Sequence, residues 1–233
     1  GCLLPATIEP GADFAAAVEG AAWILVAVPS SAFRATIRRL APLRSQRIAW
    51  ATKGLDAESG GFLHGIIEQE INPKPLMAVL SGPTFASEVG RDLPAAMTVA
   101  ANSSAFAEQM VEAFHNERFR LYTNPDMIGV ELGGAVKNVL AVATGVSDGL
   151  GLGANARAAL VTRGMAEITR LGAALGADSR TLVGLAGLGD LLLTCTDDQS
   201  RNRRFGLALG RGASIDEALV AVGSTVEGAR TAG

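Results

Sequence analysis

The sequence is short of cysteine and histidine, and it carries little net charge. Two cysteines, Cys2 and Cys195, do not make a disulfide framework, which favours a reducing, cytoplasmic location. Two histidines, His64 and His115, are too few for a metal site, and neither is given a role. A net charge of -3 gives no reason to expect nucleic acid or an anionic membrane surface as a partner.

A long hydrophobic run is also missing. The best candidate, residues 21–28, ends at Pro29 and is far shorter than the ~18–20 apolar residues of a membrane span. No signal peptide opens the chain. The chain begins with Gly1 rather than Met and stops inside a helical pattern, so both ends are expected to be truncated. With 48% apolar and 18% charged residues, the composition predicts a folded protein with a sizeable core.

The first half of the chain alternates short β-type runs with helical runs. A continuous apolar run such as 23–28 suits a strand that is buried on both faces. Ser30 or Ser31 is expected to cap the helix that follows. This alternation predicts a mainly parallel sheet with helices on both faces. The expected strands cover 23–28, 47–52, 76–80, 95–100 and 119–122, and the expected helices cover 30–40, 61–71 and 104–115.

Beyond residues 124–126 the β-type runs stop, and the pattern is helical to the end of the chain. The predicted fold class is therefore an α/β domain followed by an all-α domain, with domains 1–126 and 127–233. Ser214 and Glu217 fit a capping box that opens one of the last helices. Residues 148–155 are rich in glycine but follow a helical run, which predicts a flexible connection rather than a dinucleotide-binding turn.

Lys137 is the first candidate for chemistry. If residues 131–142 are helical, they are apolar or small nearly all round, as in a buried helix, and Lys137 and Asn138 interrupt them. A buried ammonium without a partner is unfavourable, so Lys137 has to pair, lose its proton or face a cavity. A lysine whose pKa is lowered in this way can act as a general base. An ordinary solvated lysine is the alternative at this point.

Asp190 is the second candidate, because it is the first charge in the apolar stretch 182–196. A buried carboxylate needs a cation or several donors, and Thr194 would lie one turn away on the same helix face. Asp190 is either a helix cap after a glycine-rich turn or part of a site, and the two roles can coexist. Cys195 is expected to be a small buried residue rather than a nucleophile.

Three further segments carry groups that suit a ligand. Residues 200–204 contain three arginines, and guanidinium groups bind phosphate oxygens two bonds at a time. The turns at 52–54 and 81–84 follow expected strands, and ligands of open parallel sheets bind beyond the carboxyl ends of strands. Gly82 would permit close backbone approach, and a helix starting near Thr84 would offer free N–H groups. A solvated helix start and plain turns are the alternatives.

Taken together, several segments resemble the bacterial type of NAD(P)-dependent glycerol-3-phosphate dehydrogenase. The matching segments span nearly the whole chain and are ILVAVPS, WATKGL, LSGPTFA, NPDMIGVELGGAVKNVLAVATGVSDGLGLGANARAAL, GLAGLGDLLLTC, SRNRRFG and VEGAR. The resemblance implies a Rossmann-like first domain and a helical substrate domain. It implies interconversion of glycerol 3-phosphate and dihydroxyacetone phosphate with NAD(P), which supplies phospholipid synthesis. It also implies a cytoplasmic enzyme and a homodimer.

The resemblance further implies roles for individual residues. Lys137 matches the catalytic lysine, which in neutral form would take the proton of the alcohol, while Asp190 and Thr194 match residues of the catalytic centre. Burial and Asp190 would pull the pKa of Lys137 in opposite directions, and the balance is left open. The implied substrate contacts are Lys53, Gly82, Thr84, Lys137, Asp190, Ser200, Arg201 and Asn202. The implied cofactor contacts are Lys53, Ala86, Arg201, Thr225 and Glu227.

One departure from the family pattern matters. The family begins with a strand and a G-x-G-x-x-G turn, which this sequence lacks together with the position that would read the adenosine ribose. The choice between NAD and NADP is therefore open, and a polypeptide that starts at Gly1 is expected to bind cofactor weakly and turn over little. Two alternatives remain: a 3-hydroxyacid or ketopantoate-type reductase of the same architecture, and a truncated, inactive binding fragment. The arginines and the SGPTFA turn favour a phosphorylated three-carbon substrate.

Overall fold

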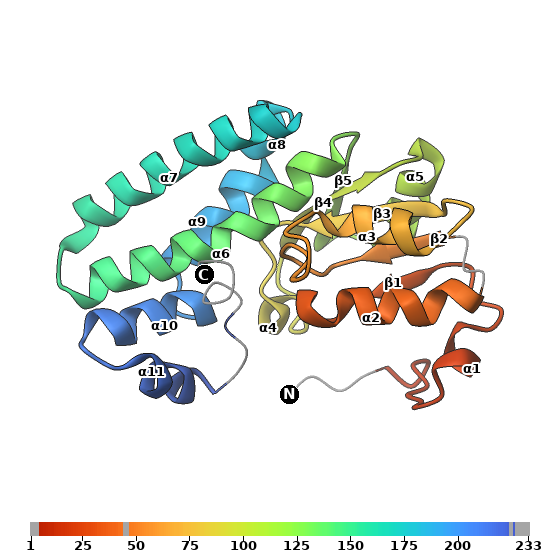
Figure 1. The fold of residues 1–233 in the computed structure, drawn as a ribbon, viewed down its shortest axis with the longest axis horizontal. Helices are drawn as coiled ribbons and strands as arrows, with labels where there is room; N and C mark the ends of the chain where they lie inside the picture. The colour runs from red at the N-terminus through yellow and green to blue at the C-terminus, as the bar shows by residue number, and fades with distance from the viewer. Residues whose placement is uncertain (1–4, 44–46, 224–225, 227–233) are drawn as a thin grey trace.

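A five-stranded sheet forms from the first half of the chain, and long helices of the second half extend from it (Figure 1). The computed structural model describes residues 5–43, 47–223 and 226. All five expected strands are present, with ends displaced by no more than two residues. The strands are β1 (Ile24–Val26), β2 (Arg47–Trp50), β3 (Leu76–Ser81), β4 (Ala95–Ala101) and β5 (Phe119–Asn124).

The strands lie in the order β1-β2-β3-β4-β5. Neighbouring strands are parallel except β3 and β4, where Ser81 lies opposite Thr98 in antiparallel register. The prediction of a mainly parallel sheet is therefore confirmed. Because β4 reverses direction, the connection 82–94 stays at the edge of the sheet where β3 ends. That edge carries the carboxyl ends of β1, β2 and β3.

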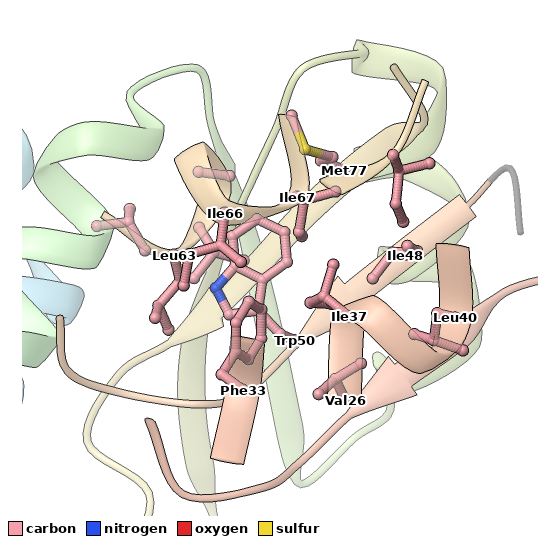
Figure 2. Packing of buried hydrophobic residues seen from close by; sticks show 14 of the residues in the cluster. Val26, Phe33, Ile37, Leu40, Ile48, Trp50, Leu63, Ile66, Ile67 and Met77 are labelled. Atoms are coloured by element: carbon pink, nitrogen blue, oxygen red, sulfur yellow. The ribbon is translucent and has the colours of Figure 1, made fainter. Parts of the chain in front are cut away.

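One face of the sheet packs against α2 (Ser30–Leu40) and α3 (Leu63–Glu70). Phe33 and Ile37 lie one helical turn apart on α2 and are fully buried beside Trp50, as Figure 2 shows. The rings of Phe33 and Trp50 meet edge to face with centroids 6.1 Å apart. Burying each such side chain stabilises the fold by ~1.5–3 kcal/mol. Residues of α2 at helical spacing thus fix the helix to this face.

The opposite face packs against α5 (Ser104–Phe114). Ala49 and Leu80 point to this side, because neighbouring strand residues alternate between faces, and they contact a cluster that includes Phe106 and Met110. Helices therefore cover both faces of the sheet. Together with the helical second half, this arrangement confirms the predicted α/β fold followed by an all-helical region.

Some local expectations were wrong. Pro29, rather than Ser30 or Ser31, occupies the position before α2, and no side chain caps that helix, because the chain leaves β1 and turns directly at the proline. The helix expected near Thr84 begins at Ala86, and α4 (Ala86–Val89) is a single turn. Two other short helices, α1 (Phe14–Val18) and η1 (Ala41–Leu43), were not expected.

The second half is entirely helical in the part that the structure describes. Ser214 and Glu217 form the expected capping box of the last helix. The elements are α6 (Met127–Gly149), α7 (Gly153–Leu175), α8 (Ser179–Leu182), a π-helical turn η2 (Leu185–Gly189), α9 (Asp190–Thr196), α10 (Arg201–Gly210) and α11 (Ile215–Val222).

The central helix of this half is α6, which runs from the sheet between α7 and α10 (Figure 1). By length and hydropathy α6 is sufficient for a membrane span, contrary to the sequence expectation, but 61% of its most apolar window is buried inside the protein. Contacts with α7, α9, α10 and the sheet cover it. Its apolar character is therefore used for packing within the chain.

Glycines allow α6 and α10 to pack backbone against backbone. A Cβ on Gly206 of α10 would lie 2.0 Å from the carbonyl oxygen of Val142, and one on Gly145 of α6 would lie 2.2 Å from that of Arg203. Real Cβ atoms do not approach backbone so closely, so only glycine fits both positions. This close packing brings the first turn of α10 beside the middle of α6, where Lys137 and Asn138 lie.

Candidate active site

A cavity of about 740 Å³ lies at the edge of the sheet where β1, β2 and β3 end. Its walls come from the turns after β1 and β2, from α4, from the middle of α6 and from the start of α10. Eight of the residues singled out from the sequence line it: Lys53, Thr84, Ala86, Lys137, Thr194, Ser200, Arg201 and Asn202. The fold therefore brings together segments that are far apart in the chain.

Asp190 holds two lysines at one side of this cavity. Its Oδ1 accepts a hydrogen bond from Lys137 Nζ at 2.6 Å, and its Oδ2 accepts one from Lys53 Nζ at 2.7 Å. Only 1% of Asp190 is exposed, and Lys137 is 8% exposed. Such a carboxylate is tolerated because both of its oxygens meet cations. The interpretation of Lys137 as an ordinary solvated lysine is thereby wrong, and so is that of Asp190 as a helix cap.

The sequence left open whether burial or Asp190 dominates the pKa of Lys137, and the structure shows that the pKa is lowered. Burial and the positive charge of Lys53 lower the pKa of the Lys137 ammonium to about 8, although Asp190 favours the charged form. Desolvation destabilises an ammonium, and a second cation within hydrogen-bonding range of the same carboxylate adds repulsion. An amine with this pKa exchanges a proton readily near neutral pH, which suits a general acid or base.

Backbone geometry fixes Asp190 and the residues around it. A π-helical turn precedes Asp190, which is the first residue of α9, and its side chain makes no cap bond to α9. Thr194 Oγ1 donates to the carbonyl oxygen of Asp190 at 2.6 Å, so its hydroxyl supports the first turn of α9 while the residue lines the cavity. Cys195 is fully buried, and burial raises the pKa of its thiol to about 11, as expected for a packing residue.

Gly82 was expected to let a ligand approach the backbone closely, but in the structure it is the neighbouring strand β4 that requires a glycine here. Its carbonyl oxygen accepts hydrogen bonds from Lys53 Nζ at 3.0 Å and from Thr84 Oγ1 at 3.3 Å, so it orients the lysine. A Cβ at Gly82 would lie 2.9 Å from the Cα of Met97 on β4. The backbone at Gly82 thus lies against the backbone of β4 in the same sheet, and a side chain would not fit between them.

Of the three arginines in 200–204, two line the cavity and one pairs with an aspartate of α6. Ser200 caps α10 by accepting from the N–H of Arg203, and Asn202 Nδ2 donates to Asn138 Oδ1 at 2.9 Å. The guanidinium of Arg203 turns away and pairs with Asp148 at 2.7 Å. Arg201 and Arg204 remain as the cluster's guanidinium-bearing residues that line the cavity. The expected group of three arginines thus supplies two to the site.

Several lining residues were given no role from the sequence, among them Asn138 and Gln199. Asn138 had a signal, since it interrupts the same apolar helix as Lys137, whereas Gln199 lies in a polar segment that looks like any loop. Thr225 and Glu227 lie outside the described residues. Within the described ranges, no three His, Cys, Asp or Glu side chains gather as a metal ion would require.

A mainly parallel sheet followed by helices, with a buried lysine of the first long helix lining a cavity at the strand ends, defines the class of open-sheet α/β proteins that bind a ligand beyond the carboxyl ends of their strands. Comparison with known proteins narrows the class. Models described as the N-terminus and C-terminus of NAD-dependent glycerol-3-phosphate dehydrogenase match residues 1–107 and 126–233. The chain belongs to the glycerol-3-phosphate dehydrogenase family, and the prediction of that family is confirmed.

Individual relatives agree. The glycerol-3-phosphate dehydrogenase (NAD(P)+) of Halorhodospira halophila is 68% identical over 231 residues, which are 99% of this chain and 70% of the relative. That of Alkalilimnicola ehrlichii is 61% identical over 233 residues, again 70% of the relative. The crystal structure of glycerol-3-phosphate dehydrogenase from Coxiella burnetii matches with a TM-score of 0.94 and 52% identity, over 97% of this chain and 70% of that one.

Proposed function

We propose that Lys137 is the acid–base residue of an NAD(P)-dependent glycerol-3-phosphate dehydrogenase. The activity and the cofactor follow from family membership at 55–68% identity. The role of Lys137 rests on one observation, namely that its buried ammonium, held by Asp190, lines the cavity at the strand ends. Family membership, rather than Lys137, sets aside a reductase of another family with the same architecture.

The chemistry requires a proton acceptor beside the alcohol. Oxidation of glycerol 3-phosphate removes a proton from the secondary hydroxyl and a hydride from its carbon, leaving dihydroxyacetone phosphate. When bound, NAD(P) supplies the acceptor of that hydride and, in the reverse direction, its donor. Neutral Lys137 takes the hydroxyl proton, and its ammonium returns a proton to the carbonyl oxygen in the reverse reaction. Asp190 orients Nζ, and Lys53 holds the other carboxylate oxygen.

The start of α10 suits the phosphate of the substrate. Arg201 and Ser200 face the cavity, and Asn202 is held against Asn138 of α6. A guanidinium fork binds phosphate oxygens in pairs, so Arg201 would fix the phosphate and thereby place the carbon next to Lys137. We assign Ser200, Arg201, Asn202, Lys53, Gly82 and Thr84 to the substrate region on this basis.

The residues at the ends of β1 and β2 fit a nicotinamide cofactor. Val28, Pro29 and Ala51 give that part of the cavity apolar walls, which suit a flat ring, and Ala86 of α4 lines the same cavity. Arg201 provides positive charge within the same cavity for an anionic cofactor. We assign Ala86, Lys53 and Arg201 to the cofactor region. Thr225 and Glu227 stay sequence-based assignments.

We also propose a division into domains 1–126 and 127–233, supported by the end of β5 at Asn124 and the start of α6 at Met127. A cytoplasmic location fits the buried, unpaired thiol of Cys195. A homodimer and a contribution to phospholipid synthesis are proposed from the family alone.

Substitution of Lys137 tests the proposed role. In the full-length protein, Lys137→Met is expected to lower kcat for dihydroxyacetone phosphate reduction by ~10²–10⁴-fold, because it removes the proton donor. Lys137→Arg keeps the charge but cannot release a proton, so it is expected to fail as well. Loss of NADPH absorbance measures turnover, and Lys74→Met, at a lysine on the surface, is the control.

An unchanged kcat in Lys137→Met would exclude the proposed role. Titration of dihydroxyacetone phosphate by calorimetry without cofactor measures binding separately from turnover, and comparing the two distinguishes a catalyst from an inactive binding fragment. A fragment would bind the phosphate ester in both the parent and the Met variant, with no turnover in either.

A further inference from the structure

Gln199 makes two hydrogen bonds across the rim of the cavity, and neither follows from the proposed chemistry. Its Oε1 accepts from Ser87 Oγ at 2.6 Å, and its Nε2 donates to Glu88 Oε1 at 2.7 Å. The amide thus uses its acceptor end and its donor end on two successive residues of α4. Because a donor and an acceptor are matched separately, the orientation of the amide is determined.

This bridge joins the two halves of the chain at the site. The residues Ser87 and Gln199 both line the cavity, and they are 112 positions apart. Gln199 directly precedes Ser200, the cap of α10, and its own backbone N–H is fixed by Asp197 Oδ1 at 2.8 Å. The Gln199 side chain therefore extends from a rigid point beside Arg201 to the opposite wall.

The helix α4, at the other end of the bridge, is weakly anchored by its own residues. It is a single helical turn without a side-chain cap and without a buried residue. It lies in the connection 82–94 between the antiparallel strands β3 and β4, on the side of α10 (Figure 1). Its attachment to Gln199 is thus a main determinant of where Ala86 and Ser87 lie relative to Arg201.

We propose that Gln199 is a positioning residue that sets the width of the cavity mouth by holding α4 opposite Arg201. The inference rests on the proposed function, because that function assigns Ala86 of α4 and Arg201 to ligand binding. Gln199 acts through α4, not on the reacting atoms. Its loss is therefore expected to weaken binding of both ligands and to leave the proton transfer at Lys137 intact.

A reversal of polarity tests the bridge in the full-length protein. Gln199→Glu keeps the shape and still accepts from Ser87, but it places a carboxylate against Glu88. The variant is expected to raise KM for dihydroxyacetone phosphate and NADPH by ~10-fold with kcat retained, which corresponds to ~1.4 kcal/mol. The second change Glu88→Gln restores a donor–acceptor pair with the roles exchanged, so the double variant is expected to regain the parent KM.

Two controls make the rescue specific. Glu88→Gln alone leaves an amide opposite an amide, which still pairs, and is expected to behave as the parent. Glu108→Gln in the Gln199→Glu background removes one negative charge at an exposed residue of α5 away from the rim, and it is expected to give no rescue. Dissociation constants from calorimetry provide a second readout that needs no turnover.

The bridge is supported if Glu88→Gln restores the parent KM in the Gln199→Glu background and Glu108→Gln does not. Equal impairment of the single and double variants, or a Gln199→Glu protein identical to the parent, would overturn it. A fall in kcat at unchanged KM would also overturn it. Failure of the proposed function is seen separately, as undiminished activity in Lys137→Met.

Discussion

Asp190 with its two lysines controls the protonation state of the site. Burial and Lys53 lower the pKa of Lys137 to about 8, while Asp190 opposes them. In the proposed mechanism, the neutral amine that prevails above this pH accepts the proton of glycerol 3-phosphate. The ammonium that prevails below it donates to dihydroxyacetone phosphate. The kcat/KM for oxidation is therefore expected to rise through about pH 8, and that for reduction to fall.

Lys53→Met is expected to shift both pH profiles. It removes the neighbouring positive charge and leaves Asp190 to Lys137 alone, and both changes raise the pKa of Lys137 toward the ordinary lysine value of 10.5. The midpoints of the kcat/KM profiles, measured from nicotinamide absorbance across pH, should therefore move to higher pH. Lys74→Met should leave them in place. An unchanged midpoint in Lys53→Met would contradict the role given to Lys53.

How much of the site could be read from the sequence depended on the residue. Lys137 and Asp190 were recognisable because a charge in an apolar stretch is anomalous. The contact between Lys53 and Asp190 was not, because the two residues are 137 positions apart and only the folded sheet edge brings them together. Gln199 gave no signal, since its partners are two polar residues on a helix of one turn.

At the scale of elements, the packing of α10 against α6 places the side of the cavity wall that carries Lys137 and Arg201. Gly206 lets the helices approach until backbone meets backbone. The sequence predicted all five strands and the helical character of the second half, because hydrophobic periodicity is visible over such lengths. It missed α1, η1 and the start of α4, since three to five residues are too few for a period, and the reversal of β4 leaves no local pattern.

Gly206→Ala is expected to destabilise the protein by ~2 kcal/mol or more, because the new methyl group has to push α10 away from α6. Urea unfolding followed by circular dichroism measures the loss. Gly65→Ala, inside α3 where no atom lies within 4 Å of the added Cβ, is the matched control and is expected to be neutral or stabilising by up to ~1 kcal/mol. Equal effects at the two sites would argue against helix contact as the cause.

For the molecule as a whole, a buried polar link joins the sheet region to the helical half. The carboxylate of Glu131 on α6 accepts from the backbone N–H of His64 on α3 at 3.1 Å and pairs with its ring Nδ1. The pKa of His64 is raised by this hydrogen bond, and the pKa of Glu131 is raised by burial although His64 opposes it. In the folded state the pair therefore holds protons more tightly than in the unfolded chain.

This link predicts a loss of stability with rising pH. Because both folded pKa values are raised, the contribution is fully present below the ordinary Glu value of 4.5 and is lost as pH rises past the ordinary His value of 6.5. The unfolding free energy of Glu131→Gln should therefore depend less on pH than that of the parent as the pH rises above 4.5 and past 6.5. Lys137 titrates in both proteins, so the difference isolates the pair.

His115→Gln, at an exposed histidine, is the control and should keep the parent's pH dependence. Urea unfolding at each pH provides the measurement. If Glu131→Gln and the parent lose stability in parallel, the link does not contribute in this way.

The sequence separation around Asp190 has a consequence during synthesis. Its partners precede it by 53 and 137 positions, so the ribosome completes the entire sheet and α6 before the carboxylate that joins the two amines exists. A nascent chain interrupted before α9 carries its lysines without their shared counter-ion, and we expect it to be inactive. Under the proposed mechanism, activity therefore requires that translation has passed Asp190 and that both halves of the polypeptide have docked.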